Sequence, residues 1–267
     1  MTHTIETDWI DDRIAVVSFS DVPRRNQMSW AAVDELGALL QKHREAGARV
    51  VILASALPGQ WLQHAWLQDL SNSVDSLPIT GSGVGWFSIL DEVTHVDTVS
   101  IAAISGDTSG GGAEIGWACD FRIAEQQVMF SQPEVNIGLT TGIGGSTRLT
   151  HLAGRTVATE MVLTGRAMPA QRLYDLGAVN RVVASGEALA TAIELARDLA
   201  CKSPLAVRGL NKILACSEQA PLREALEHEQ TVFQSVVVSE DARRGMRSTQ
   251  ARYDAEAAGR NNKQDTE

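Results

Sequence analysis

Segments typical of β-strands alternate with segments typical of α-helices from the N-terminus to about residue 183, and this alternation restricts the folds that the chain can adopt. Runs of β-branched and apolar residues predict strands at 4–10, 13–20, 49–55 and 99–106, and another in FRIAE from Phe121. Amphipathic patterns predict helices after Ser29, a common N-cap residue, and near 84–97, 110–118 and 144–153. Because strands joined by helical crossovers pair in parallel, we expect an α/β fold.

The pattern changes from about residue 186, where four helical segments follow one another without an intervening strand. We therefore expect a core over residues 1–197 that holds the active site and a helical region over residues 198–267. The apolar faces of these helices favour packing on the core or on a neighbouring subunit. Within the core, the least periodic segment is 70–85, which is either an ordinary surface loop or a mobile lid over a site.

Charge and cysteine content exclude several classes of function. The 267 residues carry a formal net charge of −10, which argues against a nucleic-acid partner but is compatible with a local pocket for a phosphorylated small ligand. The three cysteines are too widely spaced for a disulfide framework or a CxxC zinc site, so we expect a reducing cytoplasm and no metal. Without a signal-peptide pattern or an apolar stretch of membrane-helix length, neither export nor membrane insertion is expected.

Three consecutive glycines in SGGGAEIGWACDF, residues 109–121, raise the question of what approaches this backbone. Glycine tolerates positive φ and lets another group come close, and the run lies between a predicted strand and a predicted helix. The unpaired N–H groups at a helix N-terminus stabilise an oxygen that becomes negative during a reaction. GxGxxG spacing and a following GK[ST] are both missing, so the run is a candidate oxyanion hole and a poor nucleotide-phosphate loop.

Two glutamates follow the glycines. Glu114 is expected in the first turn of the helix, and Glu134 follows Pro133 at a second expected helix start. Taken singly, the position of each glutamate is explained by the helix macrodipole, which favours a carboxylate in the first turn. Together, two carboxylates that converge on one substrate can divide acid and base roles or hold one water between them.

Residues 99–149 resemble the signature region of the crotonase, or enoyl-CoA hydratase/isomerase, superfamily, with the sequence VSIAAISGDTSGGGAEIGWACDFRIAEQQVMFSQPEVNIGLTTGIGGSTRL. The family pattern of GGG-x-E, F-x-x-P-E, a glycine-rich turn and RL is complete in it. Supporting segments in family order are PRRNQMSWAAVDEL near the start, LTGRAMPAQRLYDLGAVNRVV at 163–183 and SEDARRGM at 239–246. The resemblance implies a spiral core of ββα repeats and a C-terminal helical trimerisation region, in a homotrimer or dimer of trimers.

The resemblance also implies roles for residues. The N–H groups of Gly111 and Ala65 would polarise a thioester carbonyl, and Glu114 and Glu134 would bind the water added to a 2-enoyl-CoA. Glu134 is expected to deliver the proton to C2 while Glu114 orients and activates the water. Because both glutamates are kept, hydration is favoured over isomerisation or cleavage. Coenzyme A is expected as part of the substrate, with no separate cofactor, in a lyase of the fatty acid metabolism type.

The chain departs from the family around Ala65, where the usual F-S-A-G-A-D-L is replaced by WLQHAWL. In relatives this stretch runs along the adenine of coenzyme A, so the bulky side chains of His64 and Trp66 would alter or block the binding of that ligand. His64 is either a hydrogen-bonded histidine or a group that titrates beside the site, and Trp66 is expected to pack. Further candidate contacts of the substrate are Gly110, Arg24, Arg25 and Arg252. For the three arginines, the alternative is a solvated surface position.

Two other functions stay open. Some members of the superfamily hydrolyse a C–C bond of β-diketones without CoA and also have an altered oxyanion segment. They carry histidine in place of Glu134 and an aspartate in the following glycine turn, where this chain has Ile143 and no acid. The other alternative is a non-catalytic trimeric binding protein, since a fold can persist without its chemistry.

Overall fold

The computed structural model describes residues 3–264, and the chain divides after Cys201 into two compact units. The first unit contains both sheets, and the second, from Lys202, is helical. Helix α8 (Ala188–Ala200) crosses the expected boundary between residues 197 and 198 and ends within the first unit. Among the described residues, no helix combines the length and the apolar character that crossing a bilayer requires.

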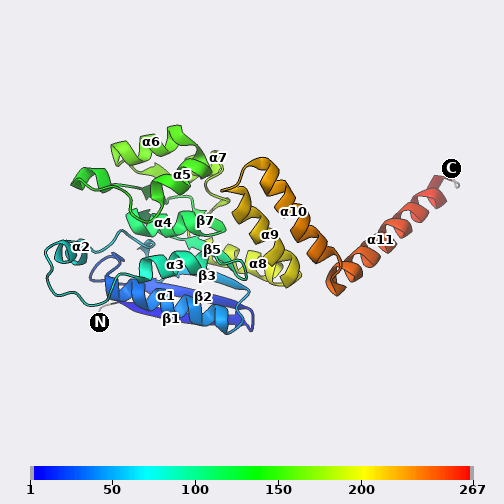
Figure 1. The fold of residues 1–267 in the computed structure, drawn as a ribbon, viewed down its shortest axis with the longest axis horizontal. Coiled ribbons are helices and arrows are strands. Elements are labelled where there is room, and N and C mark those ends of the chain that lie inside the picture. The colour runs from blue at the N-terminus through cyan, green and yellow to red at the C-terminus, as the bar shows by residue number, and fades with distance from the viewer. Residues whose placement is uncertain (1–2, 265–267) are drawn as a thin grey trace. The chain divides into compact units, whose positions relative to one another are not determined.

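Six strands form the larger sheet of the first unit, in the order β1-β2-β3-β5-β7-β10 (Figure 1). The β1–β2 hairpin is antiparallel and the other pairs are parallel. Strands β3 and β5 are buried along nearly their whole length, which is typical of parallel strands covered on both faces. The strands are β1 (Thr4–Asp11), β2 (Ile14–Ser20), β3 (Val50–Ser55), β5 (Val99–Ile104), β7 (Phe121–Glu125) and β10 (Arg181–Val183).

Four short strands form a second sheet in the order β4-β6-β8-β9. They are β4 (Gly59–Gln60), β6 (Gly106–Ser109), β8 (Met129–Ser131) and β9 (Met168–Pro169). The chain alternates between the sheets, since β3 is followed by β4, β5 by β6 and β7 by β8, with a helical segment after each pair. This is a spiral of ββα repeats, as predicted.

Helix α8 packs across β3, β5 and β7, whereas α1 and α3 lie side by side (Figure 1). The N-cap prediction at Ser29 is confirmed, because its Oγ accepts the N–H of Ala32 at 3.3 Å. The predicted loop from Leu70 begins only after Val74, because a helix too short to show clear periodicity continues to that residue. The other helices of the first unit are α1 (Trp30–Glu45), α2 (Leu67–Val74), α3 (Gly85–Val93), α4 (Gly110–Ala118), the 3₁₀ turn η1 (Glu134–Ile137), α5 (Gly145–Ala153), α6 (Arg155–Thr164) and α7 (Ala170–Asp175).

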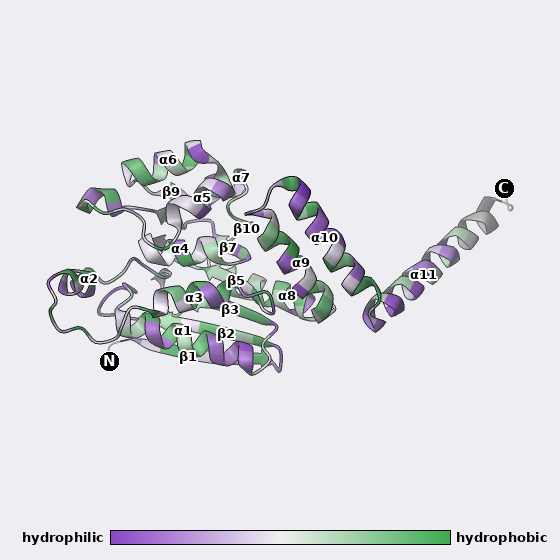
Figure 2. Ribbon diagram, in the orientation of Figure 1, coloured by the Kyte–Doolittle hydropathy of each residue, from purple (hydrophilic) through white to green (hydrophobic). Residues whose placement is uncertain are grey.

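The second unit consists of α9 (Pro204–Ser217), α10 (Leu222–Val237) and α11 (Glu240–Gln264), as the helical patterns predicted. Helices α9 and α10 pack against each other. Figure 2 shows that apolar residues recur along these two helices, whereas α11 is mostly hydrophilic. Trimerisation through this region stays a prediction.

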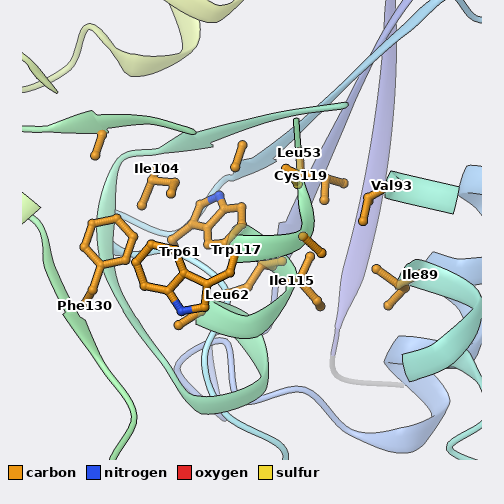
Figure 3. Packing of buried hydrophobic residues seen from close by; sticks show 14 of the residues in the cluster. Leu53, Trp61, Leu62, Ile89, Val93, Ile104, Ile115, Trp117, Cys119 and Phe130 are labelled. Carbon is orange, nitrogen blue, oxygen red and sulfur yellow. The ribbon is translucent and has the colours of Figure 1, made fainter. Parts of the chain in front are cut away.

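A cluster of large buried side chains fixes helix α4 (Figure 3). Trp61 and Phe130 are fully buried, and the rings of Trp117 and Phe130 stack with their centroids 5.0 Å apart. Ile115 and Trp117 belong to α4 itself. The helix that begins with the glycine run is therefore held in position by the core.

Candidate active site

The segment around Ala65 forms one wall of the site. The residues on either side of Ala65 pair with Met28. The Met28 N–H donates to the His64 carbonyl at 3.0 Å, and the Trp66 N–H donates to the Met28 carbonyl at 2.9 Å. Because successive peptide groups of an extended chain face opposite sides, the N–H of Ala65 faces away from Met28. The described residues provide no acceptor for it, so it is available to a ligand oxygen.

The glycine run begins helix α4, and close contacts explain its sequence. Gly110 has a φ of 51°, in the left-handed region that favours glycine. A β-carbon on Gly112 would lie 2.1 Å from the carbonyl oxygen of Leu62, so the helix passes this backbone only with glycine there. The N–H of Gly111, in the first turn, also has no acceptor among the described residues.

Glu114 is buried, and a turn of the backbone holds its carboxylate. One oxygen accepts the N–H groups of Ile143 at 2.6 Å and Gly145 at 3.1 Å, and the other accepts the N–H of Gly142 at 3.3 Å. The prediction that Glu114 lies in the first helical turn is wrong, because the glycines are themselves the first turn of α4. Its side chain is therefore oriented by three donors and not by the helix terminus.

Glu134 is the first residue of η1 and follows Pro133, as predicted for a helix start. Its side chain is partly exposed, whereas that of Gln132 is fully buried. With its amide oriented to satisfy both neighbours, Gln132 donates to Oε1 of Glu134 at 2.9 Å and accepts from the indole N–H of Trp117 at 3.2 Å. A core side chain thus orients this second carboxyl group.

Both carboxyl groups hold their protons more tightly than usual. Burial raises the pKa of Glu114 above its ordinary value, although the three N–H groups and the Arg148 guanidinium favour the charged form. Burial also raises the pKa of Glu134, and the negative charge of Glu114 adds to this effect. Carboxyl groups with raised pKa values are suited to exchange a proton with a substrate.

The two carboxyl groups and the two free N–H groups line one cavity of about 420 Å³. Much of the remaining wall is apolar and includes the side chains of Trp30, Trp86 and Ile143. No lysine or arginine is among the described residues that line it. The cavity therefore suits an uncharged acyl group with a polarised carbonyl better than it suits phosphates.

His64 and Trp66 occupy different environments. His64 lines the cavity, and its Nδ1 donates to the carbonyl of Ala65 at 2.8 Å, so the proton of a neutral ring is on Nδ1. Trp66 is not part of the cavity lining. The guanidinium of Arg24 lies 4.2 Å from its ring centroid and pairs with Asp21 at 3.0 Å.

Of the remaining predicted contacts, two lie outside the lining of the cavity and the third belongs to the second unit. Gly110 is buried and is not part of the lining, and a β-carbon there would lie 2.7 Å from Cβ of His64. Arg25 is exposed and lies outside the lining. Arg252 belongs to α11 in the second unit, where its side chain lies 3.9 Å from the Glu256 carboxylate.

Three residues of the site were not expected from the sequence, namely Gln132, Trp30 and Trp86. Gln132 lies two positions before Glu134, and that short spacing was the only signal for it. The tryptophans come from α1 and α3, and no local pattern marks them as neighbours. The glycines at 142–145 were a usable signal, since closely spaced glycines leave N–H groups accessible to a carboxylate.

Known proteins resemble this chain over most of its length. A family profile described as Enoyl-CoA hydratase/isomerase matches residues 10–255. The carnitinyl-CoA dehydratase of Shigella flexneri is 31% identical over 230 residues, which are 84% of this chain and 87% of that protein. A probable enoyl-CoA hydratase of Rhizobium meliloti (strain 1021) is 37% identical over 172 residues, which are 64% and 65% of the two chains. The crystal structure of an enoyl-CoA hydratase from Bacillus anthracis matches with a TM-score of 0.83 at 28% identity, covering 93% of this chain and 96% of that one.

Proposed function

Since this chain belongs to the enoyl-CoA hydratase/isomerase family, we propose that it is a hydratase that adds water across the double bond of a 2-enoyl thioester. One observation carries the proposal. Glu114 and Glu134, both with raised pKa values, share a cavity with the N–H groups of Gly111 and Ala65, for which the described residues provide no acceptor. Donors for an oxyanion and a proton-exchanging pair are what hydration needs.

The reaction follows from these groups. The N–H groups of Gly111 and Ala65 donate to the thioester oxygen, which becomes an enolate oxygen when C3 is attacked. Glu114, held by three N–H groups, orients the water and takes its proton as the water oxygen bonds to C3. Glu134 then gives a proton to C2 as the enolate collapses to the thioester, so one water is added and the proton taken balances the proton given.

We also propose coenzyme A as the carrier, bound as part of the substrate without a further cofactor. Relatives named carnitinyl-CoA dehydratase and probable enoyl-CoA hydratase support this carrier, because both names include coenzyme A. They also support the reaction, since dehydration is the reverse of hydration. Apolar residues along α9 and α10 support assembly as a homotrimer or a dimer of trimers. A cytoplasmic location stays a prediction.

A specific observation disfavours the β-diketone hydrolase. Glu134 lines the cavity at the position where those enzymes are expected to carry histidine, and the turn that binds Glu114 contains Ile143 and glycines without an acid. The same two glutamates, each oriented by hydrogen bonds, disfavour a binding protein without chemistry.

Isothermal titration with crotonyl-CoA, acetyl-CoA and free CoA, followed by loss of the enoyl absorbance, tests the proposal. We expect CoA-dependent binding and turnover, and we expect Glu134→Gln to remove turnover while thioester binding persists. Glu160→Gln is the matched control, because it removes an exposed carboxylate that pairs with Arg172, and its turnover should equal that of the wild type. Binding without turnover would favour the binding protein, and no CoA binding would direct the search to β-diketones.

A further inference from the structure

A single carboxylate ties the start of α3 to α1. Asp34 Oδ2 accepts the N–H and the hydroxyl of Ser82 at 2.6 and 3.0 Å, and Oδ1 accepts the N–H of Gly85 at 2.9 Å. Burial opposes ionisation of Asp34, but hydrogen bonds from Ser82 and Gly85 outweigh it and hold its pKa below the ordinary value. The side chain therefore caps α3 as a carboxylate from a neighbouring helix.

The turn that Asp34 holds is pressed against the N-terminal end of α1. A β-carbon on Gly81 would lie 2.6 Å from the backbone nitrogen of Ala31, and one on Gly83 would lie 2.9 Å from the Trp30 ring. Gly83 and Trp30 both line the cavity, whereas Asp34 does not. The geometry of this wall thus depends on a residue behind it.

Trp86, the second residue of α3, contacts Gly111, the proposed oxyanion donor. A β-carbon on Gly111 would lie 2.6 Å from Cη2 and 2.7 Å from Cζ3 of Trp86, so the edge of the indole rests on the Gly111 α-carbon. Trp86 directly follows Gly85, whose own β-carbon would lie 2.2 Å from the Val33 carbonyl oxygen. With the backbones of α1 and α3 so close, the start of α3 sets where the ring lies.

We propose that Asp34 is a positioning residue of the active site. It holds the 82–85 turn so that Trp86 supports Gly111. It also keeps Trp30, Gly83 and Trp86 in place as a preformed, largely aromatic wall of the cavity for the acyl group. The effect on catalysis rests on the proposed hydratase function, whereas the effect on the position of Trp86 does not.

The same two helices provide a matched control. Arg44 on α1 donates to Glu92 on α3 through two hydrogen bonds of 2.7 and 3.1 Å. Arg44 lies ten positions beyond Asp34, about 15 Å along the helix axis. Glu92→Gln therefore weakens the contact between α1 and α3 at the end away from the cavity.

The position of the rings is tested without a substrate by fluorine NMR of protein labelled with 5-fluorotryptophan. Six tryptophans contribute resonances, and Trp30→Phe and Trp86→Phe assign the two that matter. We expect Asp34→Ala to shift or broaden both resonances, Asp34→Asn to do so less because its amide oxygen still accepts one N–H, and Glu92→Gln to leave both unchanged. An unchanged Trp86 resonance in both Asp34 variants would overturn the proposal.

Turnover of crotonyl-CoA tests the effect on catalysis. We expect Asp34→Ala to lower kcat about tenfold, less than the hundredfold or more that follows outright loss of an oxyanion donor, with Asp34→Asn in between. Glu92→Gln should keep the kcat of the wild type at a temperature where all variants are folded. Equal losses of kcat in the Asp34 and Glu92 variants, or a displaced Trp86 resonance with unchanged kcat, would contradict the proposal. If the wild type turns over no enoyl thioester, the hydratase proposal fails alone, and the fluorine spectra still decide whether Asp34 positions Trp86.

Discussion

Glu114 accepts a 2.6 Å hydrogen bond from the backbone N–H of Ile143, which ties a carboxylate on α4 to the turn before α5. Glu134, in contrast, is oriented by the side chain of Gln132. The two carboxyl groups of the site therefore respond to different changes, because many substitutions remove a side-chain donor, whereas every residue except proline keeps the backbone N–H.

Gln132→Met is expected to lower kcat more than it changes KM, because Glu134 loses its hydrogen-bonded orientation while the cavity keeps its shape. The indole N–H of Trp117 also loses its buried acceptor, which costs about 1–3 kcal/mol of unfolding free energy. Steady-state kinetics with crotonyl-CoA and urea unfolding measure the two effects. A variant that is less stable but has the kcat of the wild type would show that Gln132 serves only the core.

The acid side of the pH profile should reflect the raised pKa values of the glutamate pair. A carboxyl group with a raised pKa keeps its proton to higher pH, so the base that activates water forms later as pH rises. We expect kcat/KM to fall on the acid side with a midpoint above 4.5, the ordinary value for glutamate. Initial rates between pH 4 and 9 check this, and a midpoint at or below 4.5 would contradict it.

The raised pKa of Glu134 should also make the thermal stability of the protein depend on pH. A carboxyl whose pKa is higher in the folded than in the unfolded chain favours folding while it is protonated, and this contribution is lost as pH rises through the folded pKa. Burial raises the pKa of Glu134, so Glu134→Gln should increase Tm at pH 8 and have little effect at pH 4. Thermal unfolding at both pH values measures the difference, and equal shifts at the two values would argue against a destabilising buried charge.

Gly111 and Trp86 should be energetically coupled, because a β-carbon on Gly111 would lie 2.6 Å from the indole. Gly111→Ala is expected to cost about 1–3 kcal/mol of unfolding free energy through overpacking, and to lower turnover. Trp86→Phe shortens the ring at the point of contact, so the double variant should recover part of both losses. A double-mutant cycle measures the coupling, and strictly additive effects would mean that the two residues do not press on each other.

The same contact affects how the oxyanion hole is tested. Gly111→Pro removes the N–H but also places a β-carbon against Trp86. Comparing Gly111→Pro with Gly111→Ala, both in the Trp86→Phe background, separates the loss of the donor from the steric effect.

Local sequence patterns were sufficient for much of the fold. The alternation of strands and helices, the N-cap at Ser29 and the helix start at Pro133-Glu134 depend on residues close in sequence, and the structure has all of them. The order of glycines and glutamates was also enough to indicate an oxyanion hole and a carboxyl pair. These features are predictable because backbone conformation and side-chain periodicity are set by neighbouring residues.

The tertiary structure alone decided how the site is held. Glu114 lies beyond the first turn of α4 because the three glycines form that turn, and its carboxylate meets a turn about thirty residues further along the chain. Asp34 and Trp86 are connected only because α1 and α3 pack side by side. Periodicity shows which face of a helix is buried but not which residues that face meets, so contacts between distant segments follow from packing.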